Sequence, residues 1–248
     1  MQRPEAKRLS EGRLHLRHGP IDLIVTAEGE RDAAFCAASQ RFATILEELV
    51  VELPRLRLPV TGKAFDGPVA QRMDRAVRPF QGLYVTPMAA VAGAVADEVL
   101  AAMTTAAPLT RAAVNNGGDI AVHLAPGYRF DLAMASVTGL GLGRIGFGAG
   151  QGISGAATSG RHGRSHSLGI ADSVTVLAVT AAAADAAATL IANAVDLPGH
   201  PAVSRTSATV LDPDSDLGDR LVTTGLGPLR PDDITRAIDA GEAAAQEM

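Results

Sequence analysis

The chain has 248 residues, of which 47% are hydrophobic, 20% charged and 3% aromatic, and it contains a single cysteine. A chain of this size buries a core large enough to fold without disulfides or structural metals, and one cysteine excludes a disulfide framework. The formal net charge of -5 supplies no cationic surface for phosphate backbones, so we expect no nucleic-acid partner.

The sequence shows no segment that would direct the chain to a membrane. Its amino terminus, residues 1–8, leads into no apolar run of signal-peptide length. The two most apolar stretches, 89–96 and 174–184, reach acidic residues well before the ~20 residues that a membrane span needs. We therefore expect a cytoplasmic protein with no membrane contact. Cys36 falls within a helical pattern, where we expect a small core residue.

The first half of the chain predicts mainly helices. Residues 12–27 alternate polar and apolar side chains about a Gly-Pro breaker and predict a hairpin. Apolar residues at helical spacing predict a long amphipathic helix over 28–53, ended by Pro54. Further helices are expected over 69–77 and from about 87 to 105.

Strands and glycine dominate the chain from residue 110 onward. The glycine-rich segment 139–155 predicts a bent edge strand or a loop pressed close to a ligand. Tight turns favour antiparallel pairing, so we expect the α+β class, an antiparallel sheet with packed helices, in one domain spanning 1–248. Strands are expected over 110–114, 120–124, 128–135, 173–179 and 203–210, and helices over 181–195 and 230–246.

One glycine motif matches a dinucleotide-binding pattern without its context. Residues 141–146 have the G-x-G-x-x-G spacing, which in those folds opens the helix that binds the pyrophosphate. Residues 147–152 are too rich in glycine to open such a helix. We therefore favour a glycine-bent strand.

A carboxylate and a hydroxyl share one face of the helix predicted over 181–195. Asp185 and Thr189 are four residues apart and point to the same side. Such an all-oxygen pair suits Mg²⁺, which takes its remaining ligands from water and substrate phosphates. Spacing alone favours the simpler alternative, in which Asp185 stabilises the first turn through the helix dipole.

Two other segments have a backbone suited to ligands. Residues 116–119 are first a turn signal, but their paired glycines also let N–H groups approach an anion or a flavin ring. Residues 158–161 place two hydroxyls, a glycine and a guanidinium in a predicted loop, a set suited to phosphate. His162 and His166 follow in the same loop, where four-residue spacing fixes no common face, so exposed or phosphate-contacting roles are favoured over a metal site.

Taken in order, these segments resemble the motifs of the ApbE superfamily, best known for FAD:protein FMN transferases. The family's N-x-G-G-[DE] turn is resembled by residues 115–119, its T-S-G loop by 158–160 and its A-D-x-x-x-T helix start by 184–189. Its upstream G-A-I-A-K-G-Y-A-V-D helix is similar to residues 88–97. The resemblance covers about residues 85–196.

This resemblance implies an ApbE-like (T-fold-like) fold and a site for FAD, with a flavin nucleotide as ligand and a protein as acceptor. It implies Mg²⁺ held by Asp185, Thr189 and the main-chain carbonyl of Ala89 against the FAD pyrophosphate, which is cleaved to pass FMN to a Thr or Ser and release AMP. The residues it implicates in cofactor binding are Gly93, Asp97, Asn116, Gly117, Gly118, Asp119, Thr158, Ser159, Gly160 and Arg161.

The chain also departs from the family pattern. Ala92 stands where the family has a lysine, and the longer His-x-x-Asp-Pro-like segment with its catalytic histidine is absent. His162, His166 and Asp172 are therefore catalytic candidates that no motif assigns to that role. The sequence resembles a compact branch of the superfamily, in which fold transfers better than function.

Three functional hypotheses stay open at this point. The first is a Mg²⁺-dependent flavin transferase or FAD pyrophosphatase. The second is a non-catalytic or accessory ligand-binding protein of the same fold. The third is an oligomeric metabolic enzyme with residues 139–155 as an interface strand, so both enzymatic activity and homo-oligomer formation are left undecided.

Overall fold

The computed structural model describes residues 3–136 and 138–248. Its centre is a seven-stranded antiparallel sheet with the strand order β1-β2-β3-β4-β5-β8-β9. The strands are Glu5–Arg8 (β1), Leu14–His18 (β2), Ile21–Gly29 (β3), Leu109–Asn116 (β4), Asp119–Leu124 (β5), Gly155–Ser159 (β8) and Val174–Ala178 (β9). Together with the helices that pack on it, this sheet confirms the α+β class.

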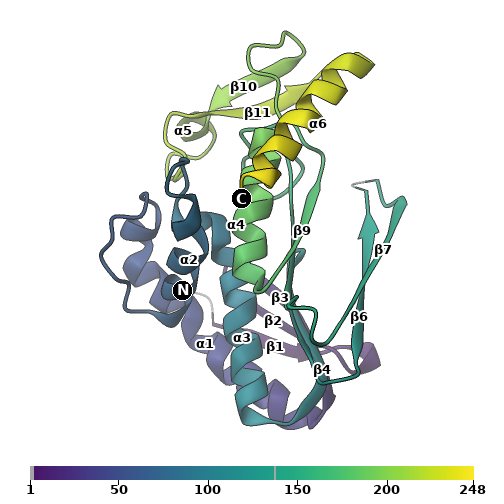
Figure 1. Cartoon of the computed structure of the whole chain (residues 1–248). Helices are drawn as coiled ribbons and strands as arrows, with labels where there is room; N and C mark the ends of the chain where they lie inside the picture. Colours follow the sequence, from purple (N-terminus) through teal and green to yellow (C-terminus); the bar gives the residue numbers. More distant parts are fainter. Residues whose placement is uncertain (1–2, 137) are drawn as a thin grey trace.

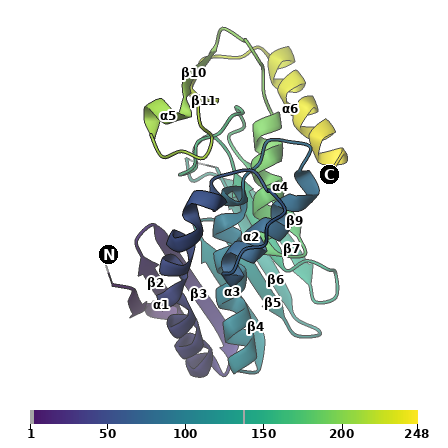
Figure 2. The ribbon, with the colours of Figure 1, turned by 90° about the vertical axis from the view of Figure 1, so that its left-hand side faces the viewer.

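Three helices lie next to one another on one face of the sheet (Figures 1 and 2). Helix α1 (Arg31–Leu56) covers β2 and β3, α3 (Val91–Ala106) covers β4 and β5, and α4 (Ala181–Ala194) covers β8 and β9. Helix α2 (Pro68–Val77) packs against α3 and α4, and 3-10 turns lie at Ser10–Gly12 (η1), Arg78–Phe80 (η2) and Pro87–Ala90 (η3). The main hydrophobic core fills the space between this helical layer and the sheet.

The opposite face of the sheet carries a two-stranded ribbon, which stands apart from the helices in Figure 1. It consists of β6 (Arg129–Ala135) and β7 (Gly141–Gly148), paired antiparallel. Because side chains alternate along a strand, Ala121 of β5 faces the helices while Ile120 and Val122 face the ribbon and pack with Phe147. Residues 141–148 of the glycine-rich segment thus form a largely exposed edge strand, one of the two alternatives predicted from its composition.

The carboxyl-terminal part adds a second small ribbon and a helix. Strands β10 (Val203–Ser207) and β11 (Leu221–Leu226) pair antiparallel, with the short helix α5 (Ala208–Leu211) between them. Helix α6 (Pro231–Gln246) then packs along α4.

Several local predictions differ from the structure. Helix α1 continues through Pro54, which lies in its last turn, where the helix is about to end and the missing N–H removes a single hydrogen bond. The strand expected over 203–210 stops at Ser207, where α5 begins. Thr158 and Ser159, expected in a loop, end strand β8. The sequence patterns predict no strand at the positions of β1 and β11.

Cys36 is exposed, so its prediction as a core residue is wrong. The buried side of α1 passes through Ala34, Phe35, Ala38 and Phe42, and Cys36 falls on the other side of the helix.

The stretch Pro87–Ala106 is long and apolar enough to cross a membrane by length and composition alone. In this fold it forms η3 and α3, and its inner face, including Val95, Val99 and Met103, is buried in the main core. A core helix passes the same hydropathy test, so the apolar character of this stretch is explained by packing.

Candidate functional site

Helices α3 and α4 begin side by side and cap one another. Both Asp97 Oδ atoms accept main-chain hydrogen bonds at the start of α4, from Ala181 at 3.0 Å and from Ala182 at 2.9 Å. In the other direction, Asp185 Oδ2 accepts the N–H of Gly93 in the first turn of α3 at 3.0 Å. A carboxylate at a helix N-terminus satisfies free N–H groups and is stabilised by the helix dipole. The two predicted site residues Asp97 and Asp185 are therefore also reciprocal caps.

This arrangement requires Gly93. A Cβ atom at that position would lie 2.3 Å from the carbonyl oxygen of Ala181, far inside van der Waals contact. The absence of a side chain lets the first turn of α3 approach α4 closely enough for Asp185 to reach it.

The turn between β4 and β5 is attached to the same helix end. Gly117 and Gly118, with φ of 69° and 114°, form the two-residue turn that the paired glycines predict. Asn116 is buried, and its Nδ2 donates to the carbonyl of Ala92 at 3.1 Å, while its Oδ1 is buried without a hydrogen-bond partner. A buried amide oxygen left unpaired marks a place where a donor or a cation would be favourable.

Asp119, the first residue of β5, meets Asp185 in this corner. Asp119 accepts a hydrogen bond from the main-chain N–H of Thr158, which lowers its pKa, but desolvation is the larger effect and raises the pKa to about 7. Desolvation, reinforced by repulsion from Asp119, raises the pKa of Asp185 well above its usual range. Two partly buried carboxylates that repel one another are stabilised either by a proton or by a bound cation.

The residues implicated in metal binding lie on elements that touch. Ala89 belongs to η3, which packs against α4, and Thr189 is one turn beyond Asp185; both residues are half-buried. No three His, Cys, Asp or Glu side chains converge on a metal-binding position anywhere in residues 3–136 and 138–248. A cation at this corner would thus rest on two carboxylates and neutral oxygens, a donor set that fits Mg²⁺ keeping several waters.

The other loop candidates gather at Asp172. Residues 160–172 form a loop whose ends meet, since Arg161 N–H donates to the carbonyl of Ala171 at 2.9 Å. Arg161 Nη2 lies 2.7 Å, and His162 Nε2 3.1 Å, from Asp172 Oδ1. Gly160 fits here because a Cβ atom would lie 2.4 Å from the carbonyl oxygen of Asp172. His166 lies exposed farther along the same loop, so only His162 and Asp172 of the three catalytic candidates are shown in contact.

Arg164 is a residue of this corner that the sequence motifs did not single out. Its Nη1 donates to the carbonyl of Pro20 at 3.0 Å, and its Nη2 lies 2.9 Å from the position that a Cβ atom of Gly117 would occupy. Its positive charge lowers the pKa of Asp119 against the effect of burial. One sequence feature could have identified Arg164: it is a basic residue next to a glycine, four positions after Gly160, in a loop whose residues 158–161 suit phosphate binding.

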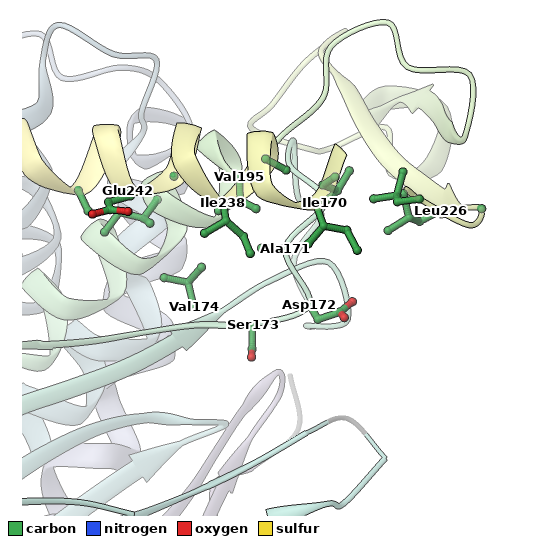
Figure 3. Close-up of a pocket in the computed structure, with 16 residues that line it drawn as sticks. Ile170, Ala171, Asp172, Ser173, Val174, Val195, Leu226, Ile238 and Glu242 are labelled. Atoms are coloured by element: carbon green, nitrogen blue, oxygen red, sulfur yellow. The ribbon is translucent and has the colours of Figure 1, made fainter. Parts of the chain in front are cut away.

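A separate apolar pocket of about 670 Å³ lies between α4, α6 and β11 (Figure 3). Ile170 and Ile238 border it, and Asp172 and Ser173 stand at its edge. Asp119 and Asp185 are not among its lining residues, so the pocket and the carboxylate pair are different features of the fold.

Comparisons with known proteins give one family model and two similar proteins. The sequence model described as AbpE bacteria matches residues 6–248. The UPF0280 protein MK0206 of Methanopyrus kandleri is 37% identical over 177 residues, covering 69% of each chain. A UPF0280 protein of Methanothermobacter thermautotrophicus is 33% identical over 192 residues, which cover 75% of this chain and 66% of the relative.

Proposed function

Since this chain belongs to the AbpE bacteria family, we propose that it has an ApbE-like fold and binds FAD, or a related adenine nucleotide, together with Mg²⁺ at the Asp119–Asp185 pair. We propose further that it acts on the pyrophosphate of that nucleotide, by transferring FMN to a protein hydroxyl or by hydrolysis. The observation that carries the proposal is the partly buried pair of mutually repelling carboxylates beside a glycine turn.

The residues of the corner would hold the cation and position its ligands. Asp185 and Asp119 would hold the cation, with Thr189 and the Ala89 carbonyl as neutral oxygen donors. The N–H of Gly93 keeps Asp185 in place, and the Thr158 N–H does the same for Asp119. Bound Mg²⁺ supplies neutralisation of the charge that develops on phosphoryl oxygens when the pyrophosphate is cleaved.

His162 is better suited than His166 to accept a proton from an attacking hydroxyl or water. Its Nε2 lies 3.1 Å from Asp172 Oδ1, and a carboxylate partner fixes the tautomer and orientation of an imidazole. Proton transfer through His162 is part of the proposal and is tested by His162→Gln.

The test is titration of the purified protein with FAD, with and without Mg²⁺, followed by chromatography for AMP and FMN. We expect FAD to bind in a Mg²⁺-dependent manner and to be converted to AMP and FMN. In Asp185→Asn, the addition of Mg²⁺ should increase neither FAD binding nor product formation. Asp239→Asn, a change of the same kind on the exposed side of α6, should behave as the unmodified protein. Unchanged Mg²⁺-dependent turnover in Asp185→Asn, with the fold intact by circular dichroism, would exclude this site.

One observation favours the second candidate, a ligand-binding protein of the same fold without catalysis. The Gly93 N–H in the first turn of α3 is bonded to Asp185, and the first two N–H groups of α4 are bonded to Asp97, so these groups are not free to bind phosphate as those of helix N-termini often do. Ala92 also removes a cation that the ApbE motif would supply. FAD binding without AMP or FMN in the same experiment would exclude the hydrolase and favour this candidate.

A further inference from the structure

The loop over residues 160–172 is closed at its base and reaches across the sheet at its tip. The base is held by the Arg161–Ala171 main-chain bond and by the contacts of Arg161 and His162 with Asp172. From this base, Arg164 extends to Pro20, which lies in the turn between β2 and β3. The loop therefore places one guanidinium over the glycine turn that carries Asp119.

The contacts of Arg164 leave its binding capacity mostly unused. The bond to Pro20 is to a neutral carbonyl, and the side chain is exposed. A guanidinium forms stronger, charge-assisted and often bidentate hydrogen bonds with phosphate oxygens. Because Gly117 has no side chain, Nη2 can lie close to the turn, 2.9 Å from the position that a Cβ atom would occupy.

The charges of the corner make such a cation favourable. Asp119 and Asp185 place negative charge where a phosphate group would have to approach, and a single divalent cation between them and a diphosphate leaves the phosphates with uncompensated charge. Arg164 approaches Asp119 from the loop side, and its positive charge acts to lower the pKa of that carboxyl.

We propose that Arg164 is the phosphate-recognition residue of this site: on ligand binding its guanidinium leaves the Pro20 carbonyl and bonds a phosphate oxygen of a nucleoside diphosphate held over Gly117 and Gly118. This inference rests on the proposed function. It assigns Arg164 to the diphosphate part of the ligand and not to its ring system. Ligands with a diphosphate, FAD and ADP, should depend on Arg164, and riboflavin should not.

The experiment measures the dissociation constants of FAD, ADP and riboflavin in the presence of Mg²⁺ for the full chain and for Arg164→Gln, Arg164→Lys and Arg144→Gln. Arg144 is exposed on β7 and serves as the matched control. We expect Arg164→Gln to weaken FAD and ADP binding about 10- to 100-fold, the range of one or two charge-assisted hydrogen bonds. Arg164→Lys should recover part of the loss, and riboflavin binding should not change.

The outcomes separate this inference from the function on which it rests. FAD and ADP binding by Arg164→Gln at the unmodified level overturns the role of Arg164 and leaves the proposed function standing. An equal loss of riboflavin affinity in Arg164→Gln also overturns the role of Arg164, because the residue would then order the loop and would not bind the phosphate. Absence of FAD and ADP binding by the unmodified protein overturns both proposals.

Discussion

At the scale of single residues, the most informative feature is the carboxylate pair formed by Asp119 and Asp185. The two residues are far apart in sequence. Taken alone, Asp119 is an ordinary residue after a turn and Asp185 an ordinary residue near a helix start. Their proximity converts them into a pair whose charged form is unfavourable, because both are partly buried and each repels the other. Such a pair is a common feature of binding and catalytic sites.

The raised pKa of Asp119, about 7, predicts an unusual pH dependence for the cation-free protein. Between about pH 4 and pH 7 the folded chain holds a proton that the unfolded chain has lost, so the free energy of unfolding should fall as the pH rises, and the full cost is present above pH 7. Asp119→Asn removes this cost and should be more stable than the unmodified protein at pH 8 by about 2–4 kcal/mol, at about 1.4 kcal/mol per pKa unit.

Urea unfolding at pH 5 and pH 8, with a chelator present, measures this difference. Asp131→Asn, on the exposed side of β6, is the matched control and should change neither value by more than ~0.5 kcal/mol. A stability difference for Asp119→Asn that is the same at both pH values would contradict the raised pKa.

At the scale of elements, the close approach of α3 and α4 organises the corner. The A-D helix start and the G-x-x-x-D pattern of α3 were assigned to cofactor and metal binding by resemblance. In the structure the same residues also have a packing role, because Asp97, Asp185 and Gly93 join the starts of α3 and α4 to one another. Burial raises the pKa of Asp97 while the two N–H groups of α4 act to lower it, so this cap stands in a largely apolar setting.

Gly93→Ala tests this helix contact. The new methyl group would lie 2.3 Å from the Ala181 carbonyl oxygen, which belongs to the backbone and cannot rotate away. We expect a loss of about 2–3 kcal/mol in the free energy of unfolding, because overpacking outweighs the better helix propensity of alanine. Gly82→Ala, where no atom lies within 4 Å of the added methyl, should stay within ~0.5 kcal/mol of the unmodified protein. Equal stability of both variants in urea unfolding would show that the helices are not packed as described.

At the scale of the whole molecule, three helices are held together by one ionic network. Glu98 of α3 accepts hydrogen bonds from Arg41 of α1 at 2.9 Å and from Arg72 of α2 at 2.8 Å. Burial acts to raise the pKa of Glu98, but the bonds and charges of the two arginines outweigh it and lower the pKa. The network therefore contributes stability above about pH 4.5, which is lost as the pH falls through the lowered pKa of the folded state.

Glu98→Gln should reduce the free energy of unfolding by about 1–3 kcal/mol at pH 7, because two partly buried arginines lose a charged partner. The difference from the unmodified protein should shrink as the pH falls below about 4.5, because Glu98 takes up a proton as the pH passes through its lowered pKa. Thermal or urea unfolding at pH 7 and over a series of acidic pH values measures this, with Glu247→Gln at the exposed carboxyl terminus as control. A deficit that stays unchanged over the whole acidic range in which the protein is folded would assign the effect to packing and not to charge.

The sequence by itself determined the α+β class, the long helices and the hairpin turns at Gly19 and at Gly117-Gly118, and it offered an edge strand as one of two alternatives for the glycine-rich segment. These features depend on local rules, namely side-chain periodicity and the backbone freedom of glycine. It also pointed to the loops and helix starts from which the candidate site is built, through motifs that are short and contiguous.

Only the tertiary structure decided which of those residues meet. Asp119, Asp185 and Arg164 come from a turn, a helix and a loop that are brought together by the strand order, in which β8 pairs with β5, and by the packing of α4 against α3. The same contacts turned Gly93 and Asp97 into packing and capping residues and drew Arg161 and His162 to Asp172. Desolvation and repulsion between residues far apart in the chain have no signature in local sequence, so the carboxylate pair and its arginine appear only once the chain is folded.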